Sequence, residues 1–316
     1  YVDYTNQYIK NEAVAKTDYS IELENELCQT NIINLSKKTY ENMFNDKADM
    51  LAQVMSDCYL VGTLNSIINN AKRRCEFYQM FSEDEKSITF TFKDGFKVKF
   101  PKDKNGNPKL LSQHKSLKGP LGYKMFEEAY ALHRLYVNAQ KTYNEHSKNI
   151  ENDIKNYAQQ DNKLNYEFCD IINKCVKYIG SPTSYEGILE GGAIYEVANA
   201  LFNVKTNSYI LQGYHDNLDS LAKNKKTSDN ELSKILTMMI EEGQSIVVGR
   251  DEFGSHTANE KYTYNGIELY NSHFSVVRYY NPKTQEVHIF ESNNPKKILI
   301  LPISVFNQQF SLLYGF

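Results

Sequence analysis

The spacing of apolar residues changes from a helical period early in the chain to a strand period near its end. Between Lys38 and about Ala71 the pattern is helical, and in MSDCYLVGTLNSIINNAKRR (55–74) Leu60, Leu64 and Ile67 recur at intervals of three and four, with basic residues closing the helix. Later segments carry first the amphipathic pattern of helices and then the short apolar runs of strands: AIYEVANALFN, DNELSKILTMMIEEG, QSIVVGRD, HFSVVRYYN, EVHIFESN and KILILP. A helical half followed by a sheet predicts the α+β fold class.

Residues 87–100, SITFTFKDGFKVKF, interrupt the helical half with a strand period. Ile88, Phe90 and Phe92 alternate before the turn residues KDG, and apolar residues alternate again after it, so we expect a β-hairpin. YKMFEEAYALHRLYVNAQ then returns to helical spacing, which continues as a charged stretch to about Tyr178.

The turn-forming segments GSP (180–182) and EGG (190–192) mark the boundary between two lobes of the chain. The sequence therefore predicts an N-terminal extension (1–36), a helical lobe (37–190) and a sheet-rich lobe (191–316). The chain begins at Tyr1 without an initiator methionine, so we expect a fragment or a processed product, and its compartment is left open.

Charge and cysteine usage exclude several classes of function. The net charge is −3, which gives no basic field for nucleic acid, and no stretch reaches the length of about 18 apolar residues that spans a bilayer. The five cysteines are odd in number and form no CxxC pair, so neither a zinc site nor a disulfide framework is indicated. This favours a cytoplasm, native or entered by delivery, over a disulfide-forming compartment.

Cys58 is the candidate nucleophile. Ser56 or Asp57 can cap the helix and place Cys58 in its first turn, where the positive end of the helix stabilises a thiolate. The alternative from the residues alone is a buried, inert thiol on a core helix.

His273 is the candidate base, because it opens the apolar strand HFSVVRYY after the loop YNSH. An Asn-Asn-Pro turn follows the next strand, and an asparagine there could accept the ring N–H of the histidine and fix its tautomer. The alternative is a strand-end histidine beside a turn-forming asparagine. His288 lies in a predicted strand, and its side chain could face either the core or the solvent. The remaining histidines are expected at the surface: His114, His133, His146, His215 and His256.

Six segments, in order between about 45 and 300, resemble the calpain-like cysteine protease domain, which has the papain-like two-lobe fold. They are SDCYLVGTLNSI, ITFTFKDGFKVKF, YKMFEEAYALH, EGILEGGAIYEVANALFN, HFSVV and SNNPKK. The resemblance implies a thiol endopeptidase acting on a protein or peptide, with its active site in the cleft between the lobes.

By position, the resemblance implies that Cys58 is the nucleophile, His273 the base and Asn294 the orienting residue, with Asn293 as the runner-up. It implies that Gln53 donates to the oxyanion with the backbone N–H of Cys58. Gln53 lies five residues before the cysteine where the family has six, and Lys296 replaces the usual tryptophan. The calcium-binding loops of animal calpains are not recognisable, so no metal ligands or other cofactors are assigned.

The chain also differs from the family by a charged helical insertion at about 132–183, which is either a solvated decoration or a contact for a partner protein. Two other functions stay open. The same three residues could serve a transglutaminase or glutamine deamidase, or the chain could be an inactive relative that binds a partner.

Overall fold

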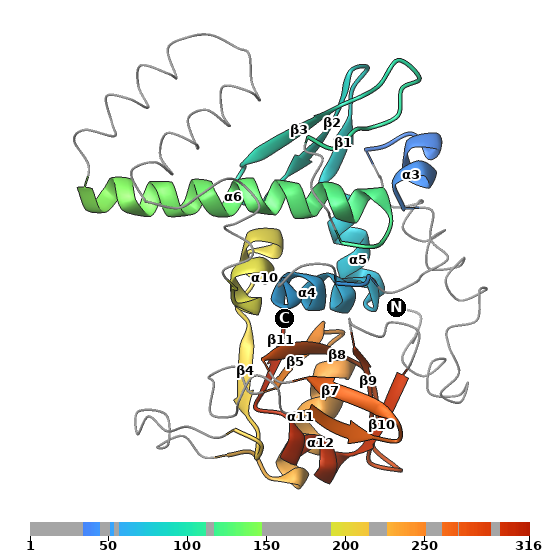
Figure 1. Ribbon diagram of the computed structural model, residues 1–316, viewed down its shortest axis with the longest axis vertical. Coiled ribbons are helices and arrows are strands. Elements are labelled where there is room, and N and C mark those ends of the chain that lie inside the picture. Colours follow the sequence, from blue (N-terminus) through green and yellow to red (C-terminus); the bar gives the residue numbers. More distant parts are fainter. Residues whose placement is uncertain are drawn as a thin grey trace.

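The computed structural model describes residues 34–44, 51–53, 57–111, 117–146, 191–214, 226–250, 261–270, 272–291 and 298–316. Within these ranges the chain forms seven helices and three antiparallel sheets, which confirms the α+β class (Figure 1). Most of the N-terminal extension and most of the predicted insertion lie outside the described residues. No helix in the described part is long and apolar enough to cross a membrane.

The first half builds one hydrophobic core, here called the N-terminal core. Its small sheet has the order β1-β2-β3, and aromatic rings such as Phe77 and Tyr123, stacked 5.5 Å apart, fill the space between this sheet and the helices. The contributing elements are α3 (Lys37–Phe44), α4 (Cys58–Ile68), α5 (Ala71–Tyr78), β1 (Phe81–Glu83), β2 (Ser87–Thr91), β3 (Lys97–Pro101), α6 (Leu121–His146) and α10 (Ile194–Phe202).

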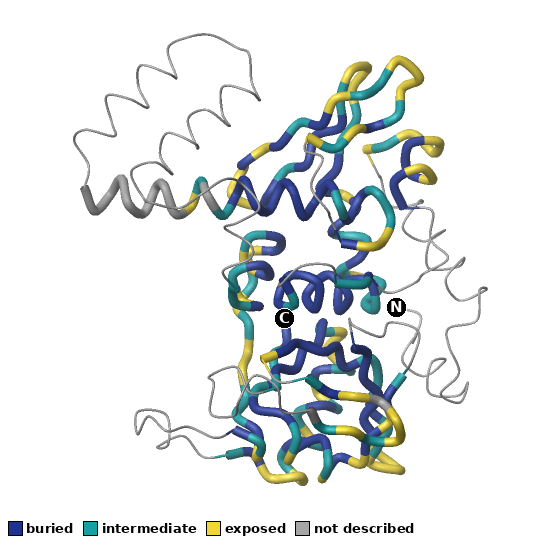
Figure 2. Tube along the Cα trace, in the orientation of Figure 1, coloured by how far each residue is buried: buried dark blue, intermediate teal, exposed yellow. Residues whose placement is uncertain are grey.

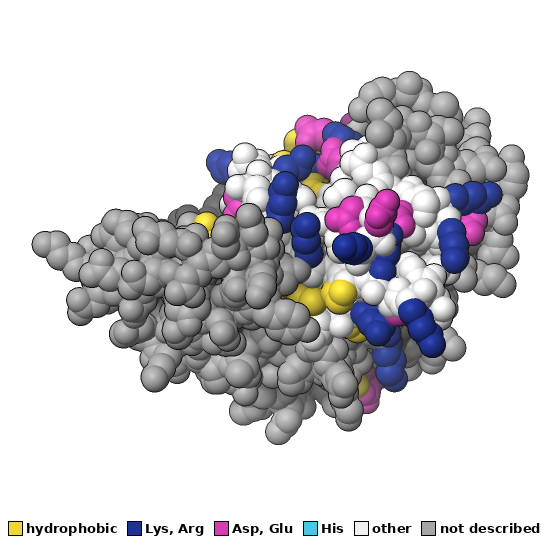
Figure 3. All heavy atoms as spheres, turned by 90° about the horizontal axis from the view of Figure 1, so that it is seen from above, with side chains coloured by type: hydrophobic (Ala, Val, Ile, Leu, Met, Phe, Trp, Pro, Cys, Tyr) yellow, Lys and Arg dark blue, Asp and Glu magenta, His cyan; other side chains and the backbone are white. Residues whose placement is uncertain are grey.

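The predicted hairpin is β2 and β3. Phe90 pairs with Val98 in the antiparallel register, and Gly95 in the connecting turn has φ of 89°, a conformation that favours glycine. On the face above this sheet, the Lys and Arg side chains of the described residues are interspersed with Asp and Glu (Figure 3).

The last third builds the C-terminal core around a six-stranded sheet of order β10-β9-β8-β5-β11-β4. Two helices pack against it, and a separate hairpin of two strands extends from it. The elements are β4 (Asn207–Ile210), α11 (Asp229–Glu241), β5 (Ile246–Arg250), the hairpin strands β6 (Lys261–Tyr264) and β7 (Ile267–Tyr270), β8 (His273–Asn281), β9 (Glu286–Glu291), β10 (Ile298–Pro302), α12 (Ile303–Gln309) and β11 (Leu312–Gly315).

Helix α4 lies between the two cores and is buried along nearly its whole length (Figures 1 and 2). Val247 of β5 and Phe274 of β8 belong to the same apolar cluster as the α4 side chains. A Cβ added to Gly62 would lie 3.1 Å from the Cβ of Phe274, so the glycine permits the close approach of helix and strand. The first turn of α4 is thereby placed next to the start of β8.

Two local predictions were wrong. The helix that contains Cys58 ends at Ile68, and the following basic residues belong to α5, which starts because the side chain of Asn70 accepts a hydrogen bond from the backbone N–H of Arg73. His133 is buried rather than exposed: its Nε2 lies 2.7 Å from Asp94 Oδ2, and its ring stacks on Phe92 at 4.2 Å.

Candidate active site

Cys58 is the first residue of α4 and is a half-buried free thiol. Asp57 is the N-cap, and its backbone carbonyl accepts hydrogen bonds from the N–H groups of Leu60 and Val61. The thiol therefore lies at the positive end of a well-formed helix, as the sequence predicted. A second cysteine, Cys75 on α5, is disulfide-bonded, which departs from the expectation that the cysteines form no disulfide.

His273 is the first residue of β8 and is 5% exposed. Its backbone pairs with Arg250 of the neighbouring strand β5, which fixes the backbone position of His273. The residue before it, Ser272, has φ of 51°, and the carbonyl oxygen of Ser272 lies 3.8 Å from Cys58 Sγ. A non-glycine residue in this conformation is uncommon and occurs preferentially at functional sites.

The side chains of Cys58 and His273 form a hydrogen bond, so the structure brings these two predicted residues together. Burial by itself lowers the pKa of His273. The interactions of the ring with Cys58 and Glu291, with the negative charges that both can carry, outweigh burial and raise the pKa to about 9. The site therefore favours an imidazolium beside the thiol.

Glu291, the last residue of β9, is the third member of the cluster and was not predicted from the sequence. Its Oε2 lies 3.3 Å from His273 Nε2, its other oxygen accepts a hydrogen bond from the hydroxyl of Ser275, and it is 3% exposed. Ser275 and Glu291 are direct partners across β8 and β9 and therefore share a face of the sheet with His273. Since Nε2 faces Glu291, Nδ1 is the ring nitrogen available to Cys58.

The other two predicted residues have different outcomes. Asn294 and the runner-up Asn293 lie outside the described residues. Gln53 is described and half-buried, next to Ala52, whose backbone exchanges hydrogen bonds with Lys118. Leu51 is tied to α4, because its N–H donates to Asn65 Oδ1 at 2.7 Å. The segment is anchored to the helix of the nucleophile, and the oxyanion role of Gln53 stays a prediction.

A pair of buried carboxyl groups lies behind the nucleophile. Asp57 and Glu127 are both fully buried, and burial raises the pKa of Asp57 to about 6 against the lowering effect of the neighbouring Glu127 carboxyl. Both oxygens of Glu127 also accept from the N–H of Leu117, at 3.2 and 3.1 Å. These contacts tie Glu127 to the segment that precedes α6.

Tyr59, directly after Cys58, connects α4 to α6 and to the segment before α10. Its hydroxyl accepts a hydrogen bond from Arg134 at 3.0 Å, and a Cβ added to Gly192 would lie 2.4 Å from its ring. The local structure thus explains both glycines of EGG. Gly192 packs against this ring, and Gly191 has φ of 81°, a conformation that favours glycine.

No cluster of three or more His, Cys, Asp or Glu side chains that could hold a metal ion occurs among the residues with described placement. Comparison with known proteins assigns no family: no protein-family model and no curated protein matches this chain.

Proposed function

We propose that the chain is a thiol endopeptidase in which Cys58 is the nucleophile and His273 the acid and base. The observation that carries the proposal is the hydrogen bond between the thiol at the start of α4 and an imidazole whose far nitrogen faces a buried carboxylate. This is the arrangement of nucleophile, base and orienting group that covalent catalysis requires. The resemblance of six segments to calpain-like proteases supports the same roles.

In this mechanism, the thiolate of Cys58 attacks the carbonyl carbon of a peptide bond, and the negative charge passes to the carbonyl oxygen. The first N–H groups of a helix have no partner within it, so the N–H of Cys58 is available to that oxygen, with Gln53 proposed as the second donor. The imidazolium of His273 gives its proton to the leaving amine as the C–N bond breaks. Water, deprotonated by His273, then hydrolyses the thioester and regenerates the thiol.

We propose Glu291 as the group that orients His273, in the role that the sequence assigned to Asn294. A carboxylate accepts the ring N–H as an amide does, but it also stabilises the imidazolium by its charge. The papain-like arrangement of two lobes belongs to the same proposal. It is supported by the two hydrophobic cores and by the position of Cys58 and His273 where they meet.

The test treats the purified chain with the thiol-directed epoxide E-64 and locates the adduct by intact mass and peptide mapping, beside a casein cleavage assay. We expect one adduct on Cys58, faster than in urea-unfolded protein, and no adduct or cleavage in Cys58→Ala. Cleavage that survives in Cys58→Ala would sink the proposal. Release of ammonia from casein without backbone cleavage would instead assign the cluster to glutamine deamidation.

A further inference from the structure

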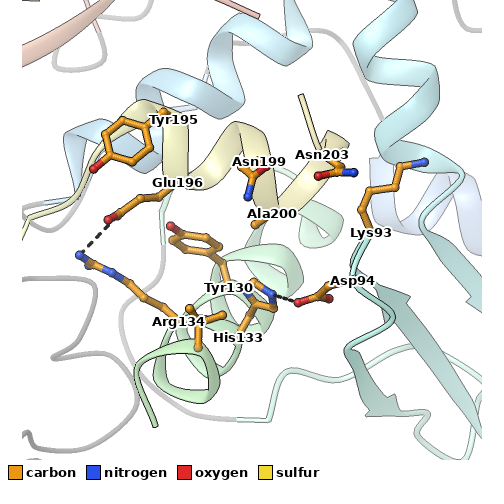
Figure 4. A pocket seen from close by; sticks show the side chains of 11 residues that line it. Lys93, Asp94, Tyr130, His133, Arg134, Tyr195, Glu196, Asn199, Ala200 and Asn203 are labelled. Atoms are coloured by element: carbon orange, nitrogen blue, oxygen red, sulfur yellow. Dashed lines mark hydrogen bonds and ion pairs between the residues drawn. The ribbon is translucent and has the colours of Figure 1, made fainter. Parts of the chain in front are cut away.

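The described part of the chain holds two buried histidines that each contact a carboxylate. His133 of α6 lies 2.7 Å from Asp94 in the turn between β2 and β3, and both side chains line a cavity of about 550 Å³ (Figure 4). His273 lies 3.3 Å from Glu291. The lining of the cavity does not include Cys58 or His273, so the first pair serves as an internal reference for the pair in the candidate active site.

The two pairs differ in the exposure of the carboxylate. The His133 side chain is 7% exposed and that of its partner Asp94 is 46% exposed. The His273 side chain is 6% exposed and that of Glu291 only 3%. Burial lowers the pKa of both rings: it prevails at His133, whereas at His273 the interactions with Cys58 and Glu291 outweigh it. A carboxylate that water does not screen acts more strongly on a neighbouring ring.

A buried carboxylate needs hydrogen-bond donors in place of water. Within the described residues, the oxygens of Glu291 have two polar partners: Oε2 faces the ring of His273, and Oε1 accepts a hydrogen bond from the Ser275 hydroxyl. Further along the same face of the sheet, the next directly opposed pair is Val277 and Ile289, and both side chains belong to the C-terminal core. Ser275 thus supplies a hydrogen bond that its apolar neighbours on this face cannot supply.

The position of Ser275 suits it to fix the glutamate. Ser275 lies two residues after His273 on β8, so both side chains are on one face of the sheet, and it is directly opposite Glu291 of β9. A glutamate side chain has three rotatable torsions, and holding it in one rotamer costs conformational entropy. A hydrogen bond from Ser275 to Oε1 selects the rotamers in which Oε2 faces the ring.

The other polar side chains near the ring are bonded elsewhere. Arg250 is the direct partner of His273 on β5, but its guanidinium donates to two backbone carbonyls. The ring of Tyr270 lies 6.4 Å from that of His273, and its hydroxyl donates to Glu268. The hydroxyl of Ser275 is therefore the group that can hold the Glu291 carboxylate in place.

We propose that Ser275 is a positioning residue of the candidate active site. Its hydroxyl holds the Glu291 carboxylate toward the ring of His273, so that the ring keeps one nitrogen on the carboxylate and the other toward Cys58. In this role Ser275 exchanges no proton with the thiol or the substrate. The role rests on the proposed function, because the hydroxyl acts on Cys58 only through Glu291 and His273.

The test is an NMR titration of the histidine ring protons in the whole chain, with the signals of His273 and His133 identified by their absence in the corresponding glutamine variants. We expect Ser275→Ala to lower the pKa of His273 by about half a unit, or about threefold in proton affinity. Ser275→Thr keeps the hydroxyl and should retain the native pKa. Ser275→Cys keeps the volume but offers only a weak donor, so it should follow the alanine variant and replaces it if that variant folds poorly.

A second measurement is the rate of casein cleavage. We expect Ser275→Ala to lower the maximal rate by about threefold to tenfold with little change in KM, because a displaced ring impairs proton transfer rather than substrate binding. Ser245→Ala is the matched control: it removes another buried hydroxyl, which donates to the Ser66 carbonyl at 3.2 Å, and should change neither the rate nor the pKa of His273.

An unchanged or higher pKa of His273 in Ser275→Ala would overturn the proposal. An equal change in the pKa of His133 would also overturn it, because it would indicate a general loosening of the fold. The lower pKa of His273 should appear in a Cys58→Ala background as well, since the hydroxyl acts through Glu291. A native chain that cleaves nothing and takes up no E-64 would end the proposed function, and the titration would still decide whether Ser275 positions the carboxylate.

Discussion

Replacing Glu291 by Gln keeps the size and hydrogen-bonding capacity of the side chain but removes its charge from His273. The rise in the pKa of His273 from 6.5 to about 9 corresponds to roughly 3 kcal/mol in favour of the imidazolium. Burial opposes this rise, so the contributions of Cys58 and Glu291 together exceed it, and an even division assigns each at least about 1.5 kcal/mol, or about one pH unit. We therefore expect Glu291→Gln to lower the pKa of His273 by about one unit or more.

The effect on stability has a defined sign. A histidine whose pKa is raised in the folded state stabilises it fully below pH 6.5 and loses this contribution as the pH rises through about 9. Glu291→Gln should therefore lower the free energy of unfolding by about 1.5 kcal/mol at pH 6. The difference should shrink or reverse above pH 9, where the native protein retains a buried carboxylate beside a neutral ring.

Urea unfolding of both proteins at several pH values measures this difference, and iodoacetamide alkylation of Cys58 at pH 7 reports the population of the thiolate–imidazolium pair. We expect slower alkylation in Glu291→Gln. Glu286→Gln, on the same strand but bonded to the Thr284 hydroxyl at 2.7 Å, is the matched control. If Glu291→Gln shows the same pH dependence of stability as the native chain, the assigned role of this carboxylate is refuted.

Two further substitutions test the surroundings of the nucleophile. Asp57→Asn should raise the free energy of unfolding by about 3 kcal/mol at pH 8 and by little at pH 4, because a pKa raised to about 6 means that the native fold is penalised once this carboxyl ionises. Equal stability changes at both pH values would contradict this. Gly192→Ala should cost about 1–3 kcal/mol in thermal or urea unfolding, because the new Cβ meets the Tyr59 ring. This cost should fall in a Tyr59→Leu background, and an unchanged cost would show that the ring is not the obstacle.

Periodicity predicted the elements whose apolar residues repeat over several turns or pairs. The β2–β3 hairpin, the long helix α6 and the strands β5, β8, β9 and β10 were all expected from the sequence. The strands β1, β4, β6, β7 and β11 were missed, because each has only three or four residues and so presents too few alternations to indicate a strand.

The missed side chains left signals that are visible in retrospect. Glu291 continues the alternation of Val287 and Ile289, which face the C-terminal core, so the strand period itself placed a charge at an inward position. His133 follows Phe126 and Tyr130 at helical spacing, yet the charged residues around it suggested a surface position. The contact between His273 and Glu291 depends on the register of β8 and β9, which single-strand patterns do not specify.

The position of α4 between the two cores has a consequence for folding kinetics. Cys58 and the start of β8 are separated by more than 200 residues of chain, as shown by the contact between Cys58 and Ser272, 214 positions apart. Contacts of such long sequence separation form late, after the loop-closure entropy has been overcome. A chain in which either core has folded alone therefore has a thiol without its imidazole partner. The thiol–imidazole pair would therefore form only when the two cores dock.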